Sequence, residues 1–252
     1  PGPTGVFGGL IFSHELIHTI GGEEDTNRNM TRRLLLLLES SPVGGNEEVH
    51  DRIIRGILNR YVAEDASFVP SNERTGKIPR FLLNDVVRFW RTMAVDYANK
   101  YRARAGEQWA LRNIKLRMSR KLLFVSGLFM CVSWTFEHRE GDNPPFRDQA
   151  LVEFLLNWTK RTPIDSLRSI ASKYAVSTLG DEIFDAYDEF LHLLSTRSDR
   201  EKLEQLSPDE AYRDPLFLRA RDTANSFDTA LLKLMFESNE SVAAVIKKYG
   251  VF

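Results

Sequence analysis

Residues 107–129, with the sequence EQWALRNIKLRMSRKLLFVSGLF, carry the pattern that decides the fold of this chain. Apolar side chains recur along them at steps of three and four, at Leu111, Ile114, Met118, Leu122, Val125 and Phe129. Because an α-helix turns once in about 3.6 residues, these steps bring the side chains to one helix face. The segment therefore predicts a long amphipathic helix from about residue 107 to about residue 138.

Helical patterns dominate the rest of the chain as well, and no apolar–polar alternation typical of a strand exceeds four residues. Thr162 and Ser207 each precede a proline and stand three residues before an acid, which is typical of a helix start. Longer helices are expected from Asn29 or Thr31 to Glu39, after Asn46, over residues 80–104 and over residues 216–236. The sequence therefore predicts an all-α fold, a multi-helix bundle.

Two interruptions divide this helical pattern. Residues 65–79 are expected to form a long loop, and Gly141–Pro145 is the clearest break in the chain. The second break predicts two packed subdomains, residues 1–140 and residues 146–252.

Composition places the chain among ordinary globular proteins, with 42% apolar and 27% charged residues. The single cysteine, Cys131, excludes an internal disulfide framework and favours a reducing compartment. The longest apolar run, residues 122–134, is shorter than the roughly 20 residues that a membrane helix needs. No signal peptide is visible, so a cytoplasmic location without a membrane partner is expected. The absence of an initial methionine suggests a processed or trimmed chain.

Positive charge is concentrated in residues 80–121, here called the basic helix pair. Eleven lysines and arginines stand there against three acids, a net charge of +8 in a chain whose net charge is −1. Such a concentration indicates either an anionic ligand or internal pairing with acids elsewhere, for example with the Asp181, Asp185 and Asp188 face of a later helix.

The candidate binding residues lie on the edges of these two helices. Asn84, Arg88 and Arg91 share one face of the first helix, and Asp85 lies beside Arg88. Cations at the margin of a buried face are partly desolvated, which favours a phosphate or carboxylate partner. The candidate substrate-binding residues are Asn84, Asp85, Arg88, Arg91, Arg112, Lys115, Arg117 and Arg120.

Three stretches of the chain also resemble a known family. They are MTRRLLLLLES (30–40), PRFLLNDVVRFWR (79–91) with WALRNIKLRMSRK (109–121), and YGVF (249–252). They are similar to the C-terminal helical region of bacterial nucleotidyltransferase-like proteins of the DNA polymerase β superfamily. The first stretch is also similar to the segment that follows the catalytic core of protein uridylyltransferases.

This resemblance implies nucleotidyl transfer with Mg²⁺ held by an Asp-x-Asp core, which this sequence does not contain. The chain would then be a non-catalytic part that binds a nucleotide or another phosphate-bearing ligand, in contact with an N-terminal catalytic domain. It would be active only when joined to that core. Its near-zero net charge and lack of a recognised motif argue against nucleic acid as a partner.

A competing motif lies near the N-terminus, where His14, Glu15 and His18 match the pattern H-E-x-x-H. Histidines at i and i+4 share a helix face and can bind Zn²⁺, while the glutamate activates the bound water. The alternative function is therefore a zinc-dependent metallopeptidase. Glu24 replaces the third histidine of the extended motif, and only 13 residues precede His14. A third possibility is a helical interaction module without chemistry, which predicts neither metal nor nucleotide binding.

Overall fold

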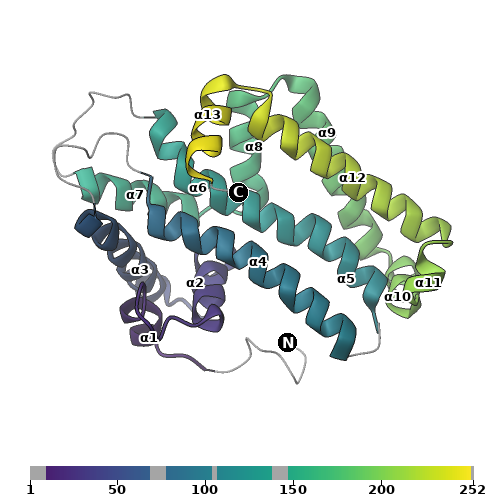
Figure 1. The fold of residues 1–252 in the computed structure, drawn as a ribbon, viewed down its shortest axis with the longest axis horizontal. Helices are drawn as coiled ribbons and strands as arrows, with labels where there is room; N and C mark the ends of the chain where they lie inside the picture. The colour runs from purple at the N-terminus through teal and green to yellow at the C-terminus, as the bar shows by residue number, and fades with distance from the viewer. Residues whose placement is uncertain (1–9, 69–77, 104–106, 138–146, 251–252) are drawn as a thin grey trace. The chain divides into compact units, whose positions relative to one another are not determined.

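The computed structural model describes residues 10–68, 78–103, 107–137 and 147–250. Within these ranges the chain forms helices and no strand, which confirms the predicted all-α bundle (Figure 1). Its elements are α1 (Ser13–His18), α2 (Asn27–Glu39), α3 (Glu47–Phe68), α4 (Arg80–Ala103), α5 (Trp109–Lys115), the π-helical turn η2 (Leu116–Arg120), α6 (Lys121–Glu137), α7 (Arg147–Thr159), α8 (Pro163–Tyr174), α9 (Ser177–Ser195), α10 (Arg197–Gln205), α11 (Pro208–Ala211), α12 (Pro215–Phe236) and α13 (Glu240–Tyr249). In that part of the chain, no helix is both long enough and apolar enough to cross a membrane.

The helices divide into two compact units, and each unit is assembled from two segments of the chain. The first unit comprises Pro1–Phe89 and Leu123–Ser166, and the second comprises Trp90–Leu122 and Leu167–Phe252. Helices α4, α6 and α8 contribute residues to both units. The expected boundary at residues 140–146 lies outside the described residues, and the subdomains 1–140 and 146–252 remain a prediction.

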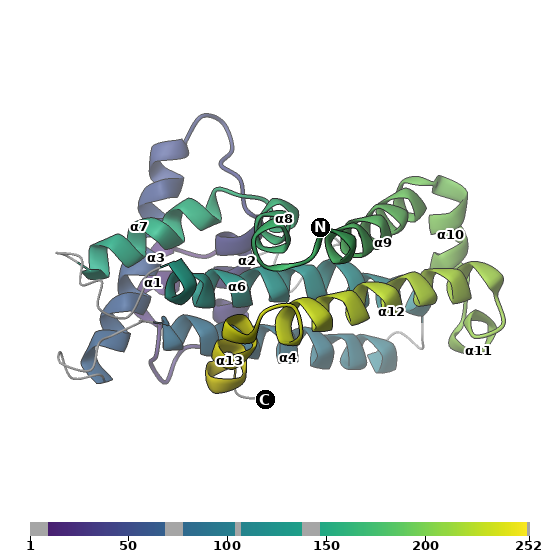
Figure 2. The same ribbon diagram turned by 90° about the horizontal axis from the view of Figure 1, so that it is seen from above.

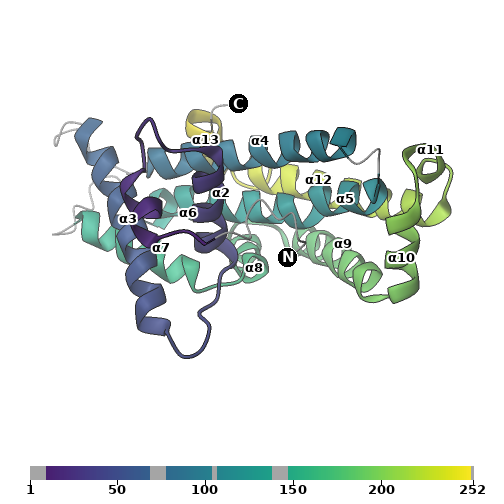
Figure 3. The ribbon, with the colours of Figure 1, turned by 90° about the horizontal axis from the view of Figure 1, so that it is seen from below.

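In the first unit, α1, α2 and α3 pack against one another, and α7 packs against α2 and α3 (Figures 1 and 3). Gly127 on α6 allows a close approach, since a Cβ there would lie 3.2 Å from side-chain atoms of Leu38 and Val86. The apolar core of this unit includes Met30, Leu34, Leu37, Ile57, Leu58, Phe89, Leu128 and Leu155.

In the second unit, α9 and α12 run side by side, and α13 packs against α12 (Figures 1 and 2). Helix α5 contacts α10, α11 and α12, and the Trp109 ring lies 5.4 Å from that of Phe217 between centroids. Its buried core includes Ile114, Met118, Ile183, Phe190, Phe217, Phe227, Leu231 and Leu234.

The predicted helix over residues 107–138 is present as α5, η2 and α6, and all six residues of its apolar stripe are buried. Two expectations at helix ends were wrong. Helix α2 starts earlier than predicted, because Thr26 is its N-cap and its hydroxyl accepts a hydrogen bond from the Asn29 backbone N–H. Helix α3 continues through residues 65–68, which were assigned to the loop; the rest of that loop, residues 69–77, lies outside the described residues.

Candidate anion-binding site

The eight predicted binding residues belong to different compact units. Asn84, Asp85 and Arg88 lie in the first unit, whereas Arg91, Arg112, Lys115, Arg117 and Arg120 lie in the second.

Asp85 belongs to a buried network in the first unit, made of Arg33, Tyr61, Asp25 and Asp85. The Arg33 guanidinium is fully buried, and its Nη2 lies 2.7 Å from Asp25 Oδ2 and 2.9 Å from Asp85 Oδ2. Its Nε donates to the Tyr61 hydroxyl at 2.8 Å, and that hydroxyl donates to Asp85 Oδ2 at 2.6 Å. Helices α2, α3 and α4 are thus joined by charge-assisted hydrogen bonds.

Burial is the largest single influence on the pKa values of Arg33 and Tyr61 in this network. It lowers the pKa of Arg33, but Tyr61 and Asp25 raise that pKa by more, so the net shift is upward. It also raises the pKa of the Tyr61 phenol well above its ordinary value, and the neighbouring Asp85 carboxylate adds to the shift. The guanidinium therefore stays charged and the phenol stays protonated, which keeps both donors available at neutral pH.

Arg88 is held by partners from the same unit. Its Nη1 donates to Asp85 Oδ1 at 2.8 Å, while Nη2 donates to the Asn27 side-chain oxygen at 3.1 Å and to the Asp25 carbonyl at 3.4 Å. Asn84, one position before Asp85, is exposed to solvent. Asp85 and Arg88 are thus in contact, as their spacing suggests, and both are engaged with neighbouring side chains.

Sequence reasoning missed Arg33, although it is the centre of this network. A signal was available, because Met30, Arg33, Leu34 and Leu37 fall at steps that share one helix face, and the other three are core residues. A cation at a core position must be paired, so this pattern indicates buried acids nearby.

In the second unit, the basic residues of α5 and η2 lie along two edges. On one edge, Asn113 donates to the Tyr97 hydroxyl at 3.0 Å, and Arg117 donates to the side-chain oxygens of Asn113 and Asn225, each at 3.1 Å. Lys121, which follows η2, forms an ion pair with Asp228 of α12. Internal pairing therefore accounts for part of the positive charge.

The other edge carries the Lys115 cluster, which we define as Lys115, Arg120, Arg200 and Glu204. Lys115 is partly buried, and burial lowers its pKa; repulsion from Arg200 of α10 and from Arg120 lowers it further, while Glu204 opposes the shift. Glu204 is already paired, since Arg200 Nε lies 3.2 Å from its carboxylate. Lys115 thus lies within the electrostatic influence of two arginines and one paired acid, and a bound anion would favour its charged form.

Arg112 and Arg91 are the remaining predicted residues of this unit. Arg112 precedes Lys115 by one turn and donates to the Gln108 side-chain oxygen at 3.2 Å. Gln108 has a left-handed backbone with φ of 56°, which is uncommon for a residue other than glycine. Arg91 is exposed on α4.

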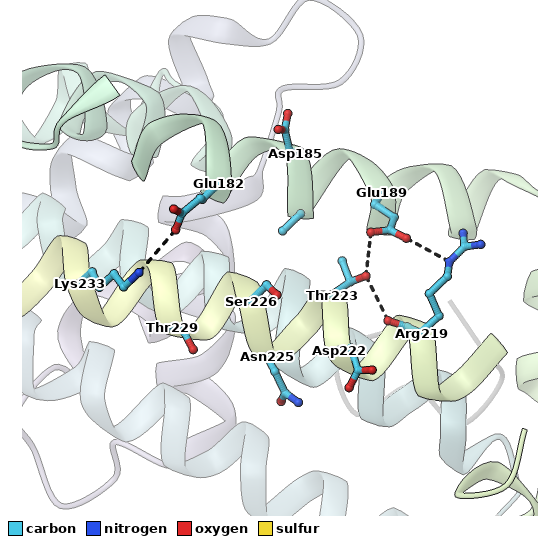
Figure 4. A pocket seen from close by; sticks show the side chains of 11 residues that line it. Glu182, Asp185, Glu189, Arg219, Asp222, Thr223, Asn225, Ser226, Thr229 and Lys233 are labelled. Atoms are coloured by element: carbon cyan, nitrogen blue, oxygen red, sulfur yellow. Dashed lines mark hydrogen bonds and ion pairs between the residues drawn. The ribbon is translucent and has the colours of Figure 1, made fainter. Parts of the chain in front are cut away.

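A groove of about 920 Å³ lies between α9 and α12 and is lined by acids and hydroxyl groups (Figure 4). Its ion pairs join α9 to α12: Glu189 lies 3.0 Å from Arg219, and Glu182 lies 3.7 Å from Lys233. Thr223 donates to Glu189 at 2.8 Å. The acidic helix is therefore paired with α12, and the acidic lining makes this groove a poor site for a phosphate.

The predicted zinc motif lies on the first described helix of the chain. Helix α1 carries His14 and His18 as predicted, and both side chains are exposed. Among residues 10–68, 78–103, 107–137 and 147–250, no three His, Cys, Asp or Glu side chains gather closely enough to hold a metal ion. Among these residues, the three protein ligands typical of a catalytic zinc site are therefore not brought together.

Comparisons with protein-family models, with curated proteins and with solved structures found no match to this chain.

Proposed function

We propose that this chain is the nucleotide-binding helical region of a nucleotidyltransferase-like protein, and that the Lys115 cluster binds the phosphates. The observation that carries the proposal is the partly buried Lys115 on α5, a helix that packs against α10, within the electrostatic influence of Arg200, Arg120 and the paired Glu204. The resemblance of residues 79–91 and 109–121 to the helical region of that family supports the same assignment.

The proposed roles follow from the contacts. Lys115, Arg120 and Arg200 contact the phosphate oxygens, because both arginines act electrostatically on the partly buried Lys115 and an anion would favour its charged form. Arg112 and Arg117 lie within one helical turn of Lys115 along the chain. Hydrogen bonds to Gln108 and Asn113 hold their side chains in place. Asp85 and Arg88 support the first unit through the buried network, and Arg91 is an exposed cation of the second unit.

The π-helical turn η2 strengthens this assignment. A π-helical turn is rare, and such turns occur frequently at functional sites because they change the direction of the side chains that follow. Here the turn spans Leu116–Arg120, between Lys115 and Lys121, and contains Arg117 and Arg120. The irregular backbone therefore coincides with the basic edge.

Catalysis is assigned elsewhere. The sequence has no Asp-x-Asp core, so the transfer step and its Mg²⁺ belong to a catalytic domain outside these 252 residues. The chain would bind and orient the nucleotide, and it would be inactive by itself.

The test is thermal unfolding of the chain with ATP, GTP, CTP, UTP or inorganic tripolyphosphate. A ligand at 100 times its dissociation constant adds about 2.7 kcal/mol of stability, which raises the midpoint by several degrees in a chain of this size. Lys115→Ala and Arg200→Ala should each remove most of the shift. Lys247→Ala, which removes an exposed lysine from α13, should leave it unchanged.

Two outcomes would contradict the proposal. One is the absence of a shift with every triphosphate. The other is an equal shift in the Lys115→Ala protein and the unmodified chain, which would place the anion site elsewhere. The non-catalytic interaction module predicts the first of these outcomes.

A further inference from the structure

Helix α1 presents a histidine pair that the proposed function does not use. His14 and His18 are both exposed, and their ring centroids lie 4.5 Å apart with a tilt of 37° between the planes. They follow the i, i+4 spacing that places two side chains on the same face of a helix. The two imidazoles therefore stand side by side and open to solvent.

The rest of α1 is anchored in the first unit, which holds this pair in place. Leu16 is buried, and its carbonyl accepts a hydrogen bond from Arg33 Nη1 at 3.3 Å. Ile17 packs closely on Gly56 of α3, where an added Cβ would lie 3.0 Å from Ile17 Cδ1. Helix α1 is thus attached to α2 and α3 through Leu16 and Ile17, while the histidines stay exposed.

Two neighbouring imidazoles suit a borderline divalent ion. Zinc–nitrogen bonds of about 2.0–2.1 Å with a tetrahedral angle place the two donor atoms about 3.4 Å apart. Centroids 4.5 Å apart bring ring nitrogens into that range after small side-chain rotations. Imidazole ligands favour Zn²⁺, Ni²⁺ and Cu²⁺ over Mg²⁺ and Ca²⁺.

We infer that His14 and His18 form a two-imidazole chelating site for a divalent transition-metal ion such as Zn²⁺. The protein contributes two ligands from α1, and the open coordination positions are filled from outside the described chain, either by water or by the same pair of a second copy. This site is distinct from a zincin centre. It lacks a third ligand among the described residues, and Glu15 lies within the electrostatic influence of Arg32 of α2.

The experiment is calorimetric titration of the purified, untagged chain with Zn²⁺ alone and with Ni²⁺ alone. His14→Ala and His18→Ala should each weaken binding by at least about tenfold, because even loss of an outer-shell partner costs that much at a metal site. His192→Ala is the matched control, since His192 is an exposed histidine on α9 with Asp188 and Thr196 at the positions four residues away. Glu15→Gln should bind the ion as the unmodified chain does.

Equal affinities in the unmodified chain and in both histidine variants would overturn the inference, as would a loss of binding in His192→Ala alone. Circular dichroism of each variant checks that the fold is retained, which is expected for exposed side chains.

The stoichiometry of binding then identifies the source of the remaining ligands. One ion per chain indicates water, and one ion per two chains with zinc-dependent dimers in sedimentation indicates a second copy; each supports the chelate. The outcome is independent of the triphosphate test, because the Lys115 cluster lies in the other unit.

Discussion

At the scale of single residues, the buried charge of Arg33 has the largest consequence for this protein. It lies on α2, is fully buried, and contacts two carboxylates and a phenol from α3, α4 and the segment before α2. A buried ion pair is costly to form but even more costly to break, because the remaining charge stays buried without a partner. This network therefore specifies one arrangement of the helices around it.

Replacement of Arg33 by alanine should lower the free energy of unfolding by about 3–5 kcal/mol, because Asp25 and Asp85 would lose a buried cation. Arg55→Ala is the control: it breaks an exposed ion pair with Glu153 and should cost less than about 1 kcal/mol. Urea denaturation of the two variants gives both values. Equal losses would show that burial does not govern the strength of these pairs.

The Lys115 cluster leads to a prediction about pH. Burial and Arg200 hold the pKa of Lys115 below its ordinary value, and a bound phosphate would raise that pKa again. Between the pKa of Lys115 in the free chain and its higher pKa in the complex, binding takes up a proton. The affinity for tripolyphosphate should therefore fall as the pH rises above the pKa of Lys115 in the free chain. Lys115→Arg should make the affinity nearly independent of pH over this range, since arginine stays charged.

This pH dependence can be measured by calorimetric titration with tripolyphosphate from about pH 7 to about pH 10. The Lys247→Ala protein serves as the control and should keep the slope of the unmodified chain. A slope that persists in Lys115→Arg would assign the titrating group to another residue.

At the scale of helices, two glycines differ in the space available for a side chain. Gly127 lies on α6 where side chains of α2 and α4 approach closely, whereas a Cβ at Gly180 on α9 would have no heavy atom within 4 Å. Glycine weakens a helix relative to alanine because it loses more conformational freedom on folding. Only at Gly127 does the packing compensate for that weakness.

Gly127→Val should therefore destabilise the protein by about 1–3 kcal/mol, because Leu38 and Val86 would have to move in a close-packed core. Gly180→Ala should have the opposite sign and raise stability by up to about 1 kcal/mol. Chemical denaturation of both variants compares them directly. A stabilising Gly127→Val substitution would contradict the close contact between these helices.

At the scale of the whole molecule, each compact unit has its own apolar core. Leu37 is 1% exposed in the first unit and Leu231 is 0% exposed in the second. Cooperative regions of a protein open with different free energies, so a cavity in one core should affect the helices of that unit most. The charge is also uneven at this scale, since residues 80–121 carry +8 in a chain of net charge −1.

Leu37→Ala and Leu231→Ala should each cost about 2–5 kcal/mol, but they should affect different helices. Hydrogen exchange measured by mass spectrometry should accelerate mainly in α2 and α3 for Leu37→Ala, and mainly in α9 and α12 for Leu231→Ala. Equal acceleration throughout the chain in both variants would show that the two units unfold as one.

The sequence by itself determined the helices and several of their ends. The apolar stripe from Leu111 to Phe129, the caps at Thr162 and Ser207, and the end of α2 at Glu39 all agree with the structure. These features depend on residues within about four positions of one another, so local spacing is sufficient to predict them. The eight candidate residues were also predicted from local spacing. Such spacing shows which side chains share an edge of a helix, but it does not show which groups of other helices face that edge.

Only the tertiary structure decided the rest. It brings Arg33 to Asp85 and Lys115 to Arg200, pairs that are far apart in the sequence, and it assembles each compact unit from two separate segments. The side chain that packs against a helix face is set by how the chain folds back, and no local periodicity encodes that choice. For this reason the helical pattern of the basic pair was predictable from sequence, whereas the burial of Asp85 and the position of Lys115 beside α10 were not.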